Sequence, residues 1–258
     1  MNTEKGQNGF PTNDAIVAVP SFSATCKRIR ENRNLSRAEA KRWHGISPTQ
    51  LFRYEAGTGV PPAAALDTLI AGYRLGAPME RHLRELRDPA LPLASIAALR
   101  EHILTRPGAA EYLAGLDTRG ILAAYIDPMF NVLAANSLLH AALIDLDDFP
   151  SIPRWIFSQP GRTTLIDHAH EADQIVARLR AETGRFRVSE QAADVVRYLG
   201  ADPEFARRWL TSSSVAYGRD ANDLVHVRTP NGNHGSYRLA FSEIDPVRHI
   251  HLVTAVPE

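Results

Sequence analysis

The chain has 258 residues, and its 29 lysines and arginines balance its 29 aspartates and glutamates. This balance, together with 44% hydrophobic residues, is typical of a folded soluble protein and excludes a fibrous or intrinsically disordered chain. The length is sufficient for two domains, each with a substantial core. The single cysteine, Cys26, excludes an internal disulfide and a cysteine-based metal cluster, and we expect it in the core of the first domain.

The first 20 residues lack a basic start followed by a sustained apolar run, so they do not have the pattern of a signal peptide. We expect residues 1–20 to form a flexible N-terminal arm. The sequence contains no apolar stretch of about 18 residues that would cross a bilayer. We therefore expect a cytoplasmic protein without a membrane partner.

The neutral total conceals an uneven distribution of charge. Residues 21–87 contain 12 lysines and arginines against 6 aspartates and glutamates, whereas residues 88–258 contain 16 against 21. A basic first third attracts phosphate groups through Coulomb forces and counterion release. The acidic remainder argues against a second nucleic-acid surface, although scattered solvated charge is the alternative interpretation of the whole pattern.

Residues 35–57 have the pattern of two short helices joined by a turn. Ser36 and Glu39 have the spacing of a capping box, in which the two side chains satisfy free backbone amides at the start of a helix. This spacing predicts a first helix over residues 37–43. Gly45 permits the turn that follows it.

The second helix begins with a residue pair that suits a helix N-terminus. Ser47 is a favourable N-cap, and Pro48 fits the first helical position because its missing N–H would have no partner there. Gly57 is expected to end the helix. The pattern is typical of a helix-turn-helix that reads DNA, although an ordinary helical hairpin with solvated polar residues shares it.

Leu51 and Tyr54 fall on one face of the second helix, where we expect them to be buried. The remaining residues are left to project toward DNA. Glutamine and arginine have hydrogen-bonding geometry that distinguishes bases in the major groove, and a helix N-terminus favours phosphate. The candidate DNA-binding residues on this helix are Ser47, Pro48, Thr49, Gln50 and Arg53.

Residues 26–87 resemble the five-helix DNA-binding domain of phage-repressor-like (XRE-type) transcription regulators. The resemblance rests on RIRENRNLSRAEAKRWHGISPTQLFRYEAGTGVPP, followed by AAALDTLIAGYRL and PMERHLREL. In that family an arginine on the first helix pairs with a glutamate at the end of the recognition helix, which implies a structural pair between Arg30 and Glu55. The family's usual glutamine at the start of the second helix is Arg37 here, which suits phosphate contact. Its usual leucine three residues later is Ala40, which thins the core.

The helix-turn-helix domain is expected to span residues 21–88 and a second domain residues 93–258. Between them the segment DPALPL contains two prolines, which interrupt the helical periodicity where the charge balance changes sign. Strands at both ends of the second domain, with helices between them, imply a mixed α/β sheet partly covered on one face. The predicted elements are a helix at 96–104, strands at 121–126 and 131–134 joined by an Asp127-Pro128 turn and followed by a helix, helices at 167–182, 189–199 and 202–210, and strands within 223–229, 236–244 and 249–256.

This order of elements is similar to the MmyB-like ligand-binding domain, which follows repressor-type helix-turn-helix modules in bacterial regulators. The matching pieces are AAYIDPMFNVLAANSLLHAAL, RWIFSQP, DHAHEADQIVARLR, DPEFARRW and TPNGNHGSYRLAFSEI with HIHLVTAVPE. That family implies a PAS-like fold with an internal pocket, suited in some members to fatty-acid-like or other apolar small molecules. The expected fold is therefore α + α/β: a five-helix repressor-like domain, then a PAS-like mixed α/β domain.

Two departures from this family bear on the ligand. His168 stands where a tryptophan usually follows the aspartate of DHAHE, and Thr229 replaces a usual histidine. Asn136 is interpreted as a helix cap rather than a ligand donor. The candidate pocket residues are Tyr125, Phe130, Trp155, Phe157, His168, Phe186, Trp209 and Tyr237. Aromatic residues are also the commonest members of ordinary cores, so each of these candidates has a purely structural alternative.

Metal binding and catalysis have weaker support in the sequence. His249 and His251 would face the same side of a strand, and His168 and His170 are equally close, yet further metal ligands at suitable spacings are not evident. We therefore predict no metal site. The serine run 212–214 lacks a nucleophile elbow, and no phosphate-binding glycine loop is present, so we predict no catalytic residues, no enzyme activity and no cofactor beyond the small apolar ligand.

These patterns together predict a one-component bacterial transcription regulator. In this hypothesis a homodimer places two recognition helices one turn apart on double-stranded DNA, and a small-molecule effector changes their relative orientation. The alternative hypothesis is a DNA-bound scaffold whose second domain binds a protein partner without sensing a ligand.

Overall fold

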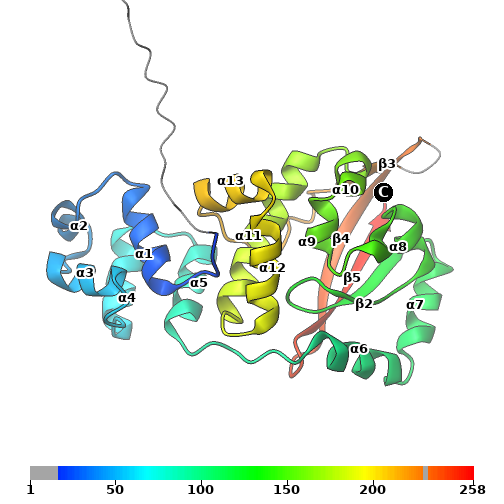
Figure 1. Ribbon diagram of the computed structural model, residues 1–258, viewed down its shortest axis with the longest axis horizontal. Helices are drawn as coiled ribbons and strands as arrows, with labels where there is room; N and C mark the ends of the chain where they lie inside the picture. Colours follow the sequence, from blue (N-terminus) through cyan, green and yellow to red (C-terminus); the bar gives the residue numbers. More distant parts are fainter. Residues whose placement is uncertain (1–16, 229–231) are drawn as a thin grey trace, which may run out of the picture.

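The structure is a computed structural model, and it describes residues 17–228 and 232–258. Its first part confirms the expected five-helix domain at the left of Figure 1. Thr229, which stands where the MmyB-like family usually has a histidine, lies outside the described residues. The five helices are α1 (Phe22–Glu31), α2 (Arg37–His44), α3 (Pro48–Glu55), α4 (Ala63–Gly72) and α5 (Ala77–Arg87).

The predicted caps of α2 and α3 are present. The hydroxyl of Ser36 accepts a hydrogen bond from the Glu39 amide at 3.2 Å, and the Glu39 carboxylate accepts one from the Ser36 amide at 2.8 Å. Gly45 ends α2 in the left-handed conformation, with φ of 72°. Ser47 caps α3 by accepting from the Gln50 amide at 3.2 Å. These contacts are local, which is why the sequence pattern identifies them.

The second part of the chain contains the expected mixture of helices and strands. Helix α7 and the short helices α9 and α10 are not among the predicted elements, because helices of nine residues or fewer gain most of their stability from packing. The elements are α6 (Ile96–Thr105), α7 (Ala109–Asp117), β1 (Leu122–Ile126), β2 (Val132–Ala135), α8 (Ser137–Ala142), the 3-10 helix η1 (Leu146–Asp148), α9 (Ile152–Ile156), α10 (Gln159–Thr164), α11 (His168–Arg185), α12 (Glu190–Gly200), α13 (Pro203–Thr211), β3 (Val225–Arg228), β4 (His234–Asp245) and β5 (Ile250–Pro257).

The five strands form one antiparallel sheet in the order β2-β1-β5-β4-β3. The first and last strands of the domain are therefore neighbours, with Ala124 opposite Val253. This register closes the domain by pairing segments more than 100 residues apart in sequence. The arrangement agrees with the predicted PAS-like mixed α/β domain.

Helices cover one face of the sheet and, around β1 and β2, part of the other face, which corrects the expectation of cover on one face. Every residue of β1 is buried, and its side chains alternate between two separate cores. Leu122 and Ala124 face the core formed with α8 to α13, whereas Ala123 and Tyr125 face a smaller core formed with α6 and α7. A strand that is apolar at every position needs cover on both sides, and the unpredicted α7 provides part of it.

The two domains are in direct contact through α1 and α5 on one side and α11 and α13 on the other (Figure 1). The segment that precedes α1 takes part as well. The indole of Trp209 donates a hydrogen bond to the Ala18 carbonyl at 3.2 Å, and Val17 packs against Gly200. Residues 17–20 of the predicted flexible arm thus lie against the second domain, and residues 1–16 lie outside the described residues.

Candidate functional site

The candidate DNA-binding residues of α3 lie at the outer side of the first domain, away from the second domain (Figure 1). Thr49, Gln50 and Arg53 are exposed, whereas Leu51 and Tyr54 are buried. Helical periodicity therefore separates the two faces as predicted. The remaining two candidates, Ser47 and Pro48, are half-buried at the helix N-terminus.

A buried ion pair holds α3 against α1, in the place that the repressor resemblance implies. The Arg30 guanidinium donates to both carboxylate oxygens of Glu55, at 2.6 and 2.9 Å, and to the Leu35 carbonyl at 2.7 Å. Both charged residues are only 7% exposed. The hydrogen bond to Glu55 raises the pKa of Arg30. This bidentate geometry fixes the angle at which α3 leaves the domain core.

Arg37 is positioned by the same carboxylate. Its Nε donates to Glu55 at 2.8 Å, and its guanidinium lies 5.1 Å from the centre of the Phe52 ring. Within the described part of the chain its two terminal nitrogens have no hydrogen-bond partner. Arg37 is thus held at the exposed side of α2 and α3 with donors that remain available for a phosphate oxygen.

Phe52 is a residue of this surface that was not among the sequence candidates. Its side chain is 52% exposed although it is large and apolar, and it lies on the same helix as Thr49 and Arg53. Its spacing from Leu51 and Tyr54 already places it outside the buried stripe, which is the signal that could have identified it. An aromatic side chain on a DNA-reading helix can contact the methyl group of thymine.

We expect Phe52 to recognise a thymine in the preferred DNA sequence. Replacing that thymine with deoxyuridine removes one methyl group, which should weaken binding about fourfold because a buried methylene contributes about 0.8 kcal/mol. Fluorescence anisotropy with a duplex selected by the protein measures the effect. The Phe52→Ala variant should show no further loss on the same substitution. A full loss in that variant would assign the methyl contact to another residue.

The second candidate site is a cavity of about 120 Å³ between the sheet and helices α8, α9 and α11. Aliphatic and aromatic side chains from four strands form most of its wall. Of the predicted pocket residues, Phe130, Trp155 and Tyr237 line it. The domain therefore contains an apolar cavity at which three of the eight candidate pocket residues meet.

The other five candidates do not line this cavity. Tyr125 points to the opposite face of the sheet, because successive residues of a strand alternate. Phe157 and Trp209 each pack against Phe205, with ring centroids 5.3 Å apart. Phe186 packs against the His249 ring at 4.9 Å. These aromatic residues belong to the core, which was the structural alternative for each of them.

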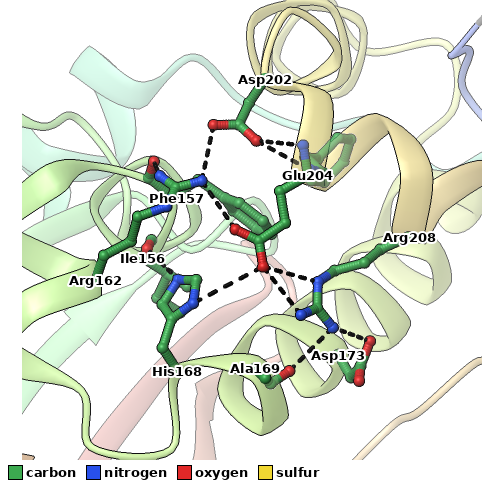
Figure 2. A network of polar contacts seen from close by, with 10 residues as sticks. Ile156, Phe157, Arg162, His168, Ala169, Asp173, Asp202, Glu204 and Arg208 are labelled. Carbon is green, nitrogen blue, oxygen red and sulfur yellow. Dashed lines mark hydrogen bonds and ion pairs between the residues drawn. The ribbon is translucent and has the colours of Figure 1, made fainter.

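His168, the fifth of these candidates, belongs to a polar network that joins α10, α11 and α13 (Figure 2). Its Nε2 lies 3.0 Å from the Ile156 carbonyl, and its Nδ1 lies 3.9 Å from the Glu204 carboxylate. Glu204 also pairs with Arg162 at 3.0 Å and with Arg208 at 2.9 Å. Although burial opposes it, these arginines hold the pKa of Glu204 below its usual value. His168 therefore has a structural role outside the pocket.

Polar groups at one side of the cavity come mainly from α11. Arg219 closes this side by pairing with Glu171 at 2.6 and 2.7 Å and with Asp223 at 3.0 Å. Arg178 lines the same cavity and has no such partner in the described part of the chain. Glu171, Ile175 and Arg178 recur at helical spacing on the inward stripe of α11. Charged residues in an apolar stripe are the sequence signal for this site.

The histidine pairs do not form a metal site in the structure. His170 pairs with Asp223 at 2.9 Å. His249 precedes β5 in a left-handed conformation, with φ of 56°, so it does not share a strand face with His251. Among residues 17–228 and 232–258, no three histidine, cysteine, aspartate or glutamate side chains gather as metal ligands would. No helix within these ranges has the length and apolar character needed to cross a membrane.

Comparison with protein families agrees with both halves of this arrangement. The model of the MmyB-like transcription regulator ligand binding domain matches residues 106–255, more than half of the chain. A helix-turn-helix domain model matches residues 21–83. A search of curated proteins finds no match. The chain therefore belongs to the MmyB-like transcription regulators, in which a helix-turn-helix domain binds DNA and is followed by a ligand-binding domain.

Proposed function

We propose that this regulator is a one-component sensor, in which a small apolar molecule in the cavity changes how a homodimer binds its DNA operator. The observation that carries the proposal is the position of α11. One part of this helix lines the cavity through Ile175 and Arg178. Its C-terminal part packs against α5 of the DNA-binding domain. A ligand that moves α11 would therefore act on both domains.

The contact between α5 and α11 is close enough to transmit small displacements. A Cβ atom on Gly184 would lie 2.6 Å from Cε1 of His82, which is fully buried. Leu86 is also within van der Waals reach of that position. Close-packed interfaces of this kind shift between discrete arrangements rather than deforming smoothly.

A second connection runs through residues 212–224, which link α13 to β3. Arg219 of this segment lines the cavity, and Tyr217 donates a hydrogen bond to the Glu85 carboxylate of α5. The Arg81 guanidinium, also on α5, lies 3.8 Å from the centre of the Tyr217 ring. The cavity wall thus contacts the DNA-binding domain at a second point. Under the proposal, ligand and DNA influence each other's affinity through these two contacts.

The cavity also favours sensing over the alternative function. A scaffold without a ligand has no need for an apolar cavity, because empty space in a core forfeits dispersion contacts and costs stability. The cavity of about 120 Å³ supports an apolar occupant, for which the family resemblance implies a fatty-acid-like molecule. The scaffold hypothesis instead requires an exposed partner-binding face on the second domain.

Binding to DNA that flanks the protein's own gene tests this function. We expect fluorescence anisotropy to detect saturable binding whose affinity falls steeply with salt, because each phosphate contact contributes about 0.9 to the logarithmic slope. The Arg53→Ala variant should bind about fivefold to a hundredfold more weakly. Arg197→Ala, which removes a 74% exposed side chain on α12, is the matched control and should bind normally.

Adding extracted metabolites to the same assay tests the sensing step. Under the proposal at least one fraction changes the affinity of the wild-type protein. Equal binding to flanking DNA and to unrelated DNA would contradict the assignment as a sequence-specific regulator.

His82 makes the domain contact sensitive to acid. Burial and the nearby Arg180, Arg28 and Arg187 lower the pKa of His82 to about 3, and neither ring nitrogen has a described partner. The folded protein therefore excludes a proton that the unfolded chain binds below its ordinary pKa. The contribution of the neutral His82 side chain to the free energy of unfolding is therefore present above pH 6.5 and is lost as the pH decreases toward 3. The expected loss at pH 5 is about 2 kcal/mol.

Urea unfolding at pH 7.5 and pH 5 measures this loss. The His82→Leu variant should show a smaller difference between the two pH values than the wild-type protein. An identical difference in both proteins would exclude His82 as the source.

A further inference from the structure

Arg178 is an uncompensated charge in the wall of an apolar cavity. Its guanidinium lies 3.6 Å from the centre of the Phe241 ring and 5.0 Å from that of Phe130. In the described part of the chain it forms no hydrogen bond and no ion pair. Cations lie favourably against aromatic faces, but the rings do not satisfy the five N–H donors of a guanidinium.

The Glu182 charge favours the charged form of Arg178 from a distance, but no described carboxylate forms an ion pair with it. The other arginine of the cavity, Arg219, is already paired with Glu171 and Asp223. Glu182 and Glu243 line an adjoining cavity of about 180 Å³ that also borders Arg178, yet neither carboxylate forms an ion pair with it. Arg178 is therefore the lining arginine that has no ion-pair partner among the described residues, which leaves its donors for an occupant.

The charge is present at neutral pH. Burial lowers the pKa of Arg178 to about 10, which is still well above physiological pH. A half-buried cation that has no ion pair in the described part of the chain loses hydration without gaining a counter-charge, so its retention is explained if a ligand provides that charge.

The volume of the cavity limits the size of that ligand. At about 120 Å³ it is slightly smaller than an engineered cavity of roughly 150 Å³ that binds benzene. An apolar body of about six non-hydrogen atoms therefore fits within this volume, whereas a long-chain fatty acid would extend beyond it, into the adjoining cavity or toward solvent. A ligand of this size is shorter than the long acyl chain that a fatty-acid-like ligand implies.

We infer that the cavity binds a small monocarboxylate with an aromatic ring or a short aliphatic chain, its carboxylate paired with Arg178 and its apolar body against the sheet. This inference rests on the proposed sensing function and specifies the ligand class of the same cavity. The fork of donors on arginine matches the two oxygens of a carboxylate, and the apolar wall strengthens the pair by lowering the local dielectric constant.

Isothermal titration calorimetry of the full chain tests the inference. The probes are benzoate, hexanoate and myristate, with benzamide as the neutral counterpart of benzoate and benzylamine as the cationic one. We expect benzoate or hexanoate to bind most tightly, benzamide to bind about tenfold more weakly, and benzylamine not to bind. Arg178→Met should weaken carboxylate binding about tenfold to a hundredfold. It should leave benzamide binding unchanged.

Two further variants make the result specific. Arg178→Lys keeps the charge but loses the planar fork, so its carboxylate affinity should lie between those of the wild-type protein and Arg178→Met. Arg197→Met removes an exposed arginine from α12 and should bind carboxylates as the wild-type protein does. Because Arg178→Met removes a half-buried charge that has no ion pair, its thermal midpoint should not fall, which shows that the variant is folded.

Several outcomes would overturn the inference. They are tighter binding of myristate than of both small acids, undiminished carboxylate binding by Arg178→Met, and no binding of benzoate or hexanoate. Its failure is distinguishable from failure of the proposed function, because DNA binding is measured on the same preparation. A metabolite fraction that alters DNA affinity while both small acids fail to bind would reject only the ligand class. Bound carboxylate that leaves DNA affinity unchanged would instead reject the sensing function.

Discussion

The Arg30→Met variant is expected to unfold its DNA-binding domain with about 3 kcal/mol less free energy than the wild-type protein. The substitution leaves the Glu55 carboxylate buried without its bidentate partner. Arg37 remains at 2.8 Å, which places the expected loss at the low end of the range for a broken buried pair. DNA affinity should fall as well, because Glu55 orients both Arg37 and the end of α3.

Urea denaturation followed by circular dichroism measures the loss of stability. The matched control is the double variant Arg30→Met with Glu55→Leu, which removes both charges and should recover most of the stability because no buried charge is left unpaired. Equal stability of Arg30→Met and the wild-type protein would contradict the conclusion that this ion pair holds α3 against α1.

The Gly184→Val variant is expected to uncouple ligand binding in the second domain from DNA binding by the first. Its Cβ would meet the His82 ring at 2.6 Å, and the ring cannot move freely because it is fully buried. Overpacking of this kind costs about 1–3 kcal/mol, and the contact between α5 and α11 is where the cost falls. Each domain should still fold and bind, while the ligand loses its influence on DNA affinity.

Two measurements check this expectation. Limited proteolysis should cleave the segment between α5 and α6 faster in Gly184→Val than in the wild-type protein, and the ligand-induced change in DNA affinity should disappear. Gly115→Ala is the matched control, since nothing lies within 4 Å of the added Cβ on α7. That substitution should be neutral or slightly stabilising. Unchanged coupling in a folded Gly184→Val protein would exclude this contact as the route of transmission.

Features that depend on neighbouring residues in sequence could be predicted. The capping box at Ser36, the left-handed Gly45 and the Ser47 cap all arise from interactions over a few residues. The pairing of Arg30 with Glu55 spans 25 positions and came from family resemblance rather than from local pattern. Fold class likewise followed from the order of elements and from resemblance.

Features that depend on packing between distant segments could not be predicted. Aromatic composition identifies core residues but does not say which core they join, so Tyr125 and Phe186 were taken as pocket residues although they pack elsewhere. The wall of the cavity is decided by strand register and by the path of α11 across the sheet. Arg178 was missed because its significance is the lack of a partner, which only the folded chain reveals.

The central claim is tested most directly by the affinity of the full chain for its selected duplex. This affinity is measured first with the cavity empty and then with the cavity saturated by a ligand found by calorimetry. Coupling between sites in regulators is typically 1–3 kcal/mol, so saturation should change the dissociation constant by about fivefold or more in the wild-type protein. The change should be lost in Gly184→Val. Identical dissociation constants for the empty and saturated wild-type protein would contradict the account.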